Sequence, residues 1–324
     1  MTGRRARALS ARAVGLAAGF ALDRVLGEPA RRHPVAGFGK LAGALERRSY
    51  ADRRGVGVAY TAVLVGGAVG VGLALEAATR RGPVARAAVT AVATWAVLGA
   101  RSLEREALAV AAHLDRGDLP AARKRLTHLV GRDTTQLDAS EISRAVVESV
   151  AENTSDAVVA PLVWGAVAGV PGLLGYRAAN TLDAMVGHRS ARYARFGWAS
   201  ARLDDLLNVP GSRLSAALAA ALAPAVGGRP ADAVRAWRRD AAGHPSPNAG
   251  PVEAAFAGAL GIRLGGVNRY GDRVENRHVL GDGRAVEGAD VARAARLARL
   301  VDLAACATAC AFAAASARAR DHVD

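Results

Sequence analysis

The segment Val56–Ala78, VGVAYTAVLVGGAVGVGLALEAA, constrains the fold more than any other part of the chain. Its only charged residue is Glu76, close to its end, and pairs of arginines flank it at 53–54 and 80–81. An apolar run of this length is typical of a helix that crosses a lipid bilayer. We therefore expect an integral membrane protein.

Further apolar segments predict a mainly helical, multi-span bundle, an all-α membrane protein formed as one domain over residues 1–324. About four to six crossings are expected, from candidate segments at 13–22, 56–78, 84–100, 157–175, 215–226 and 300–317. Pro161, Pro171 and Gly172 interrupt segment 157–175, which predicts a kinked or re-entrant helix. Residues 1–22 resemble a signal peptide, but no cleavage motif follows, so a membrane or interfacial helix is favoured.

Two polar stretches, 101–156 and 227–290, separate these segments and are expected to be cytoplasmic helical or irregular insertions. The chain is 51% hydrophobic yet carries a net charge of +14, nearly all of it from arginine. Arginine-rich loops before Val56 and after Ala100 indicate the cytoplasmic side. The arginines form no basic stripe with interleaved aromatics, so nucleic acid is not an expected partner.

The stretch 131–156, GRDTTQLDASEISRAVVESVAENTSD, places a narrow acidic stripe on one helix face. The stripe runs from Asp138 and Glu141 past Arg144 to Glu148, Glu152 and Asp156, and the apolar segment follows directly. A solvated helix face is the simpler interpretation. Ionisable groups beside a membrane segment usually face a cavity or a partner, however, so a divalent-cation site is the alternative.

A second polar group follows the proline-broken segment. Asn180 and Asp183 share a helix face, and RLDDLLNVPGSRL at 202–214 supplies Arg202, Asp204, Asp205, Asn208 and Arg213. These side chains suit metal or phosphate binding, and surface ion pairs are the alternative.

Two further stretches carry candidate side chains. SPNAGP, with Ser246 and Asn248, predicts a loop that presents N–H groups to an anion at a helix N-terminus, or simply a capped helix. Asp23, Glu28, Arg31, Arg32 and His33 form a dense polar cluster after the first apolar run. The sequence contains no G-x-x-x-x-G-K-[ST] phosphate loop, no G-x-G-x-x-G and no H-E-x-x-H.

Together these stretches resemble the CobD/CbiB family, the adenosylcobinamide-phosphate synthases of cobalamin biosynthesis. The resemblance rests on DRVLGEPARRHPVAGFG at 23–39, DTTQLDASEISRAVVESVAENTSD at 133–156, RLDDLLNVPGSRL and SPNAGPVEAAFAGALG at 246–261. They occur in the family's order over most of the chain. Gly211, after Pro210, stands where the family pattern suggests a residue such as alanine.

The resemblance implies a multi-pass protein of the inner or plasma membrane that acts on its cytoplasmic face. Its reaction would join (R)-1-aminopropan-2-ol O-phosphate through an amide to the free propionate of adenosylcobyric acid, with ATP and Mg²⁺. The corrinoid would be substrate rather than prosthetic group. Membrane lipid and other cobalamin-assembly enzymes would be partners.

Residue roles are expected as follows. Metal ligands would be Glu148, Glu152 and Asp156 with Asp204 and Asp205, and Glu28 or His33 would deprotonate the amine, so that the catalytic set is Glu28, His33, Glu148 and Glu152. Substrate and phosphate would meet Arg144, Asn153, Asn180, Arg202, Arg213, Ser246 and Asn248. A membrane transporter and a non-catalytic scaffold for corrinoid enzymes are the alternatives, although no inverted repeat supports a transporter.

Overall fold

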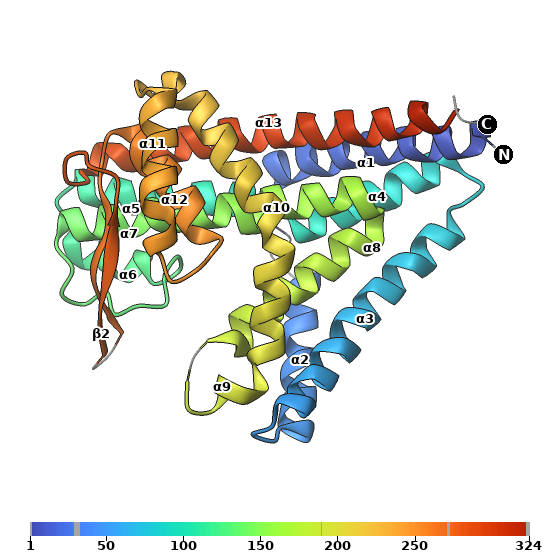
Figure 1. The fold of residues 1–324 in the computed structure, drawn as a ribbon, viewed down its shortest axis with the longest axis horizontal. Coiled ribbons are helices and arrows are strands. Elements are labelled where there is room, and N and C mark those ends of the chain that lie inside the picture. The colour runs from blue at the N-terminus through green and yellow to red at the C-terminus, as the bar shows by residue number, and fades with distance from the viewer. Residues whose placement is uncertain (1, 29–32, 189, 271–272, 322–324) are drawn as a thin grey trace. The chain divides into compact units, whose positions relative to one another are not determined.

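The computed structural model describes residues 2–28, 33–188, 190–270 and 273–321, and most of them are helical (Figure 1). The chain divides into two compact units, each assembled from separate stretches of sequence. Unit 1 comprises Met1–Gly99, Ala160–Asn208 and Cys306–Asp324, and unit 2 comprises Ala100–Val159 and Val209–Ala305. Two long helices, α10 (Trp198–Leu222) and α13 (Gly288–Asp321), contribute to both units.

In the described part of the chain, five helical stretches are long and apolar enough to cross a membrane. They are Arg54–Ala78, Pro83–Asp115, Ala139–Gly187, Trp198–Val226 and Gly288–Ser316. Each contains or overlaps one predicted apolar segment, so the expected fold class, a mainly helical multi-span membrane protein, is confirmed. The stretch Arg54–Ala78 has only 22% of its most apolar window buried within the protein. Its outward valines and leucines therefore suit contact with lipid.

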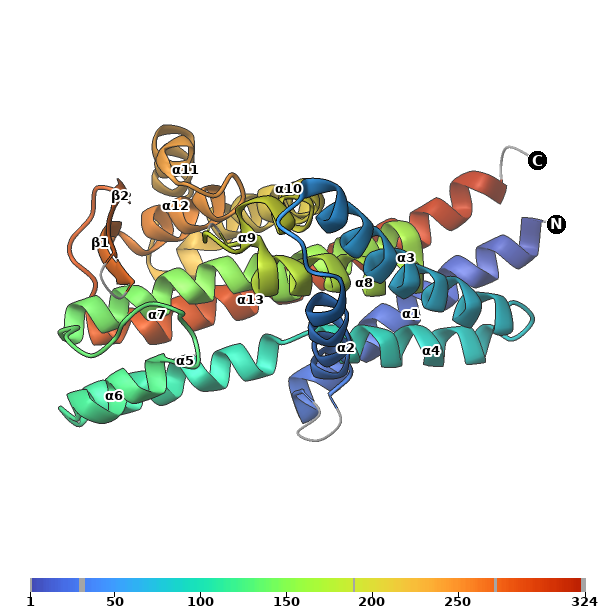
Figure 2. The same cartoon turned by 90° about the horizontal axis from the view of Figure 1, so that it is seen from below.

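Unit 1 contains α1 (Thr2–Leu26), α2 (Pro34–Ser49), α3 (Arg54–Ala78), α4 (Pro83–Val97), α8 (Ala160–Leu182) and α9 (Tyr193–Phe196). Helices α1 and α4 lie side by side (Figure 2). Gly15 and Gly19 of α1 form the contact, because a Cβ at either position would lie 2.5 Å from an atom of α4. Small residues four apart are the usual means by which membrane helices approach closely.

The expected break in segment 157–175 is a kink at Gly169, whose backbone has φ 68° and ψ −146°. In a regular helix the carbonyls of Ala166 and Val167 would accept from residues 170 and 171, but Pro171 has no N–H. Arg12 Nη1 instead donates to both carbonyls, at 3.1 and 3.2 Å. The kink therefore keeps its backbone carbonyls hydrogen-bonded inside the protein, as membrane depth requires.

Glu76 completes this arrangement, which we call the kink cluster: Arg12, Glu76, Arg86 and the backbone of residues 166–170. Glu76 Oε1 accepts from the Val170 N–H at 3.2 Å. Its carboxylate lies 3.7 Å from Arg12 Nη2 and 3.8 Å from Arg86 Nη2. Charges within two apolar segments of the sequence, Glu76 and Arg86, thus meet each other and Arg12 just before a third, as intramembrane charges usually do.

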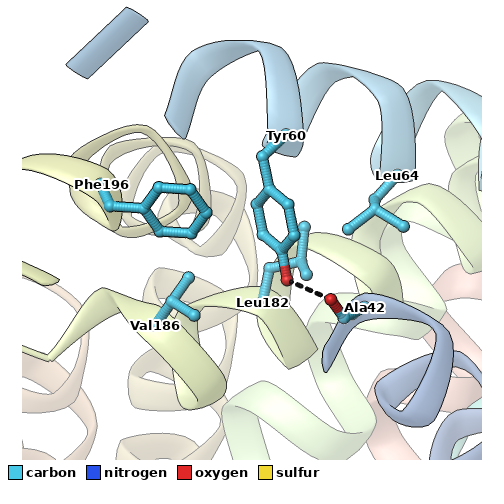
Figure 3. Close-up of a cluster of buried hydrophobic side chains, with 6 residues drawn as sticks. All are labelled: Ala42, Tyr60, Leu64, Leu182, Val186 and Phe196. Carbon is cyan, nitrogen blue, oxygen red and sulfur yellow. Dashed lines mark hydrogen bonds between the residues drawn. The ribbon is translucent and has the colours of Figure 1, made fainter. Parts of the chain in front are cut away.

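A second part of unit 1 is an apolar core between α2, α3, α8 and α9 (Figure 3). Tyr60 donates its hydroxyl proton to the carbonyl of Ala42 at 3.1 Å, and its ring lies 4.9 Å from that of Phe196. A buried tyrosine is stable here because its single polar atom has a partner. The core consists of Ala42, Tyr60, Leu64, Leu182, Val186 and Phe196.

Unit 2 contains α5 (Ala100–Asp115), α6 (Leu119–Leu126), α7 (Ala139–Thr154), α11 (Pro230–Asp240) and α12 (Ala249–Leu260). Asp138 and Glu141 form a capping box at the start of α7: the Glu141 N–H donates to Asp138 Oδ1 at 2.8 Å, and the Asp138 N–H donates to Glu141 Oε2 at 2.9 Å. These two acids therefore fix where α7 begins. The rest of the stripe starts at Arg144.

Unit 2 also contains an antiparallel hairpin that was not expected, β1 (Leu264–Tyr270) and β2 (Arg273–Leu280). A bulge lies between Leu264 and Gly266, where Gly265 and Gly266 adopt φ of 81° and 85°. Only glycine adopts such angles readily. The consecutive glycines of LGGVN were the available signal for this bulge.

Candidate functional site

The predicted site residues divide between the two units, and each unit is described by itself. Unit 1 carries Glu28, His33, Asn180, Arg202, Asp204 and Asp205. Unit 2 carries Arg144, Glu148, Glu152, Asn153, Asp156, Arg213, Ser246 and Asn248. Arg31 and Arg32 lie outside the described residues.

Glu28 and His33, the predicted bases, are neighbours in unit 1. His33 Nε2 lies 3.8 Å from Glu28 Oε2, while Nδ1 accepts the N–H of Val35 at 3.1 Å and caps α2. That hydrogen bond fixes the ring, and in the neutral form it leaves the proton on Nε2, facing Glu28. The histidine thus has a structural role in starting α2 whatever else it does.

Asp204 is the centre of a polar network in unit 1. Its two carboxylate oxygens accept from the side-chain amides of Asn180 at 3.3 Å and Asn208 at 2.9 Å. The Tyr176 hydroxyl donates to Asn208 Oδ1 at 2.6 Å. Asp205 lies on another face of α10, where it pairs with the exposed Arg202 at 3.5 Å. The structure therefore brings Asn180 to Asp204, while Arg202 meets Asp205 as a surface ion pair.

Glu148, a predicted site residue of unit 2, is held by several hydrogen bonds, and only 5% of it is exposed. Its Oε2 accepts from Arg132 Nη2 at 2.5 Å, and its Oε1 accepts from Arg144 Nη1 at 3.3 Å and the Gly265 N–H at 2.9 Å. Arg144 also donates to the carbonyls of Gly265 and Val267. Three donors occupy most of the lone pairs of this carboxylate. The geometry favours Glu148 as the anchor that holds β1 against α7.

The rest of the stripe lies one turn further along. Glu152 is exposed, and Asp156 is half-buried in a π-helical turn, Ser155–Val159, a feature frequent at functional sites. The Asn153 amide donates to the Ser149 carbonyl at 2.9 Å and lies back against its own helix. Glu152 and Asp156 are thus the two carboxylates that follow Glu148 along the stripe.

The loop before α12 holds three predicted residues together. Arg213 Nη1 donates to the Pro247 carbonyl at 3.0 Å and to Asn248 Oδ1 at 2.7 Å. Ser246 Oγ accepts the N–H groups of Asn248 and Ala249, at 3.3 and 3.1 Å. Because Ser246 takes these two N–H groups, the loop is a capped helix start in which Arg213 fixes Asn248.

Four residues that sequence reasoning missed lie in the same part of unit 2, namely Arg132, His244, Glu253 and Arg277. Glu253 is 2% exposed and its Oε1 lies 3.6 Å from His244 Nε2. Burial, reinforced by the charges of Glu148 and Glu152, raises the pKa of Glu253 well above its usual range, while Arg277 and Arg132 oppose this shift. Burial also lowers the pKa of His244.

A signal for Glu253 was present in the sequence. It is the single charged residue in AGPVEAAFAGAL, an otherwise apolar helix. Buried carboxyl groups are rare unless they are paired or functional. We call the group Arg132, Glu148, Glu152, His244, Glu253 and Arg277 the glutamate cluster.

The arrangement of carboxylate, histidine and cysteine side chains limits how a metal ion could bind. Within the described ranges, no three side chains of His, Cys, Asp or Glu lie in an arrangement that could hold a metal ion. Mg²⁺ needs only one or two carboxylates when substrate phosphates supply further oxygens. Glu152 and Asp156, one helical turn apart, fit that limited requirement, whereas Glu148 is already bound by arginines.

Comparisons with known proteins agree with this arrangement of motifs. The family model described as CobD/Cbib protein matches residues 16–298. A protein named cobalamin biosynthesis protein CobD from Mycobacterium tuberculosis is 54% identical over 291 residues, covering 90% of this chain and 92% of the relative. Relatives of the same name from Stutzerimonas stutzeri and Pelobacter propionicus are 46% and 44% identical, covering 84% of this chain and 88% and 86% of their own lengths.

No solved structure matches the chain significantly. The family match covers all four motif stretches, including the loop before α12 and the whole of α7. The chain therefore belongs to the CobD/CbiB family of cobalamin biosynthesis proteins.

Proposed function

We propose that the protein is the amide ligase of this pathway, an adenosylcobinamide-phosphate synthase. It would join (R)-1-aminopropan-2-ol O-phosphate to the free propionate of adenosylcobyric acid and consume ATP. The observation that carries this proposal is the glutamate cluster, which gathers carboxylates, arginines and a histidine from α7, α12, β2 and the loops before α7 and α12. Such a mixture suits a reaction that handles polyanions and moves a proton.

The chemistry explains why these residue types are needed. A carboxylate is a poor acyl donor until it is activated, most simply as an acyl phosphate, and the amine must lose a proton before it attacks. Glu152 and Asp156 would hold Mg²⁺, which would shield the phosphate charges. Arg213 would orient a phosphate, with Ser246 and Asn248 holding its loop in place, since arginine suits multidentate phosphate contacts.

The catalytic assignment differs from the sequence-based one in one respect. The polar contacts made by Glu148 favour an anchoring role, so we propose Glu152 and Asp156 rather than Glu148 as the metal-facing carboxylates. Glu28 and His33 belong to unit 1, and their assignment as bases stays a prediction.

The direct test uses purified protein in lipid nanodiscs with ATP, MgCl₂, adenosylcobyric acid and aminopropanol phosphate. We expect the amide product together with stoichiometric ADP and inorganic phosphate. Glu152→Gln should lower turnover strongly, whereas Glu287→Gln, at an exposed carboxylate of unit 2, should not. A transporter or a non-catalytic scaffold would give no product with any form of the protein.

We also propose that the protein resides in the cytoplasmic membrane with its active face toward the cytoplasm, where ATP is available. Reporter fusions after residues 140 and 270 should both report the cytoplasm. Opposite locations for the two reporters would rule out one active face built from α7 and the hairpin.

A further inference from the structure

Glu253 occupies a position that packing alone does not explain. Its helix, α12, is otherwise apolar, and nearly every residue of that helix is buried. A buried carboxyl group is costly, and an apolar side chain of similar size usually stabilises such a position better. The ion-pair partner that the structure gives Glu253 is a histidine rather than an arginine.

His244 is held against Glu253 by the loop that precedes α12. The Ser246 N–H donates to His244 Nδ1 at 3.1 Å, which directs Nε2 toward Glu253 Oε1, 3.6 Å away. Only 5% of the His244 side chain is exposed. Among the described residues, Nε2 has no hydrogen-bond partner. A buried polar atom without a partner calls for a bound group or a catalytic role.

The surroundings of Glu253 make it an unusually strong base for a carboxylate. Burial is the largest cause of its raised pKa, and Arg277 and Arg132 only partly oppose the shift. A raised pKa brings a carboxylate closer to the working pH of a general base. The groups that face it are Arg132, Glu148, Glu152, His244 and Arg277.

We propose that Glu253 is the general base that deprotonates the primary ammonium group of the acyl acceptor, with His244 as its positioning residue. This inference rests on the proposed ligase function and names the part of the site that receives the amine.

The Glu253 carboxylate takes one proton from the ammonium nitrogen, and the lone pair so freed attacks the activated acyl carbon. The C–N bond forms, and the C–O bond to phosphate breaks. Phosphate leaves with that electron pair and accepts the second nitrogen proton as the amide forms.

The test compares two nucleophiles on the same enzyme in nanodiscs. Aminopropanol phosphate is protonated at neutral pH and needs a base, whereas hydroxylamine is largely unprotonated and traps the acyl phosphate as a hydroxamate without one. Glu253→Gln should lower amide formation about 100-fold or more and leave hydroxamate formation near the wild-type rate. Glu287→Gln is the matched control and should change neither.

His244 is tested by the pH profile of amide formation. In the wild type, the rate should fall as the pH is lowered, because Glu253 becomes protonated. The midpoint of this acid limb should lie above the usual pKa range of a carboxyl group. His244→Asn should shift this limb and lower the rate, and His244→Gln should restore part of it. In Glu253→Gln the limb should disappear.

Each outcome decides something. If the wild type gives neither amide nor hydroxamate, the ligase proposal itself fails. If the wild type is active and Glu253→Gln loses both products, Glu253 is structural and the base assignment is overturned. Unchanged amide formation in Glu253→Gln overturns it as well.

Discussion

In unit 1, Glu76 meets Arg12 and Arg86 at the kink of α8, whereas in unit 2, Glu253 meets His244 near the start of α12. Glu76 accepts a backbone N–H and lies between two arginines. Glu253 is more deeply buried, and within the described part of the chain it faces a histidine nitrogen that has no hydrogen bond. The first carboxylate accepts the Val170 N–H that the kink leaves without its helical acceptor, and the second keeps a reactive proton-binding group buried.

The difference between Glu76 and Glu253 shows that buried carboxylates have two kinds of role in this protein. Where an acid and its partners together hydrogen-bond the backbone groups that lose their helical partners at a kink, the role of the acid is structural. Where an acid is buried without such compensation, its burial raises its pKa and suits it to chemistry. Each prediction below perturbs one side of this comparison.

The largest effect on stability is expected from Glu76→Ala. The substitution leaves Arg12, Arg86 and the Val170 N–H without their carboxylate, and breaking a buried ion pair costs about 3–5 kcal/mol. The yield of folded protein and its thermal midpoint in detergent should both fall steeply. A midpoint within a degree of wild type would show that the kink does not depend on Glu76.

Glu148→Gln should have the next largest effect. The amide cannot form ion pairs with Arg132 and Arg144, so we expect a loss of about 2–4 kcal/mol and a looser attachment of β1. Proteolysis should cut the hairpin faster than in wild type while unit 1 resists as before. Cleavage at the wild-type rate would contradict the anchoring role.

The pH dependence of stability should distinguish Glu253 from Glu76. A carboxyl whose pKa is raised in the folded protein stabilises it fully below the ordinary value, about 4.3, and this contribution is lost as pH rises through the raised pKa. In Glu253→Gln this loss is absent. Between pH 5 and 8 its thermal midpoint should therefore fall less than that of wild type, by about 2 °C or more. Parallel curves would show that Glu253 is not buried as a neutral acid.

The smallest effect on stability is expected from Asp205→Asn, because its partner Arg202 is 62% exposed. Surface ion pairs contribute about 0–1 kcal/mol, so the thermal midpoint should barely change. The ligase rate of this variant is then a clean readout. A strong loss of activity without a loss of stability would support the predicted metal-binding role of Asp205.

Sequence reasoning found the elements and most of the polar residues, but not their partners. The apolar segments, the break near Pro171 and the acidic stripe on 139–156 all follow from short-range patterns. The capping box at Asp138 and Glu141 was also readable, since a D-x-x-E pattern before an apolar run indicates a helix start. The hairpin at 264–280 was missed because polar, glycine-containing strands give a weak pattern.

The sequence by itself determined that this is a helical, multi-span membrane protein of the CobD/CbiB family, because hydrophobic length and motif order are local properties of the chain. Only the tertiary structure decided that Arg12 reaches the kink of α8 and that His244 faces Glu253. It also decided that Arg132 and the Gly265 N–H donate to the Glu148 carboxylate. These contacts join residues up to 155 positions apart. The spacing of polar and apolar residues in the sequence does not predict which carboxylate pairs with which donor. That choice is made by packing, which buries each charge only where a partner or a function accepts it.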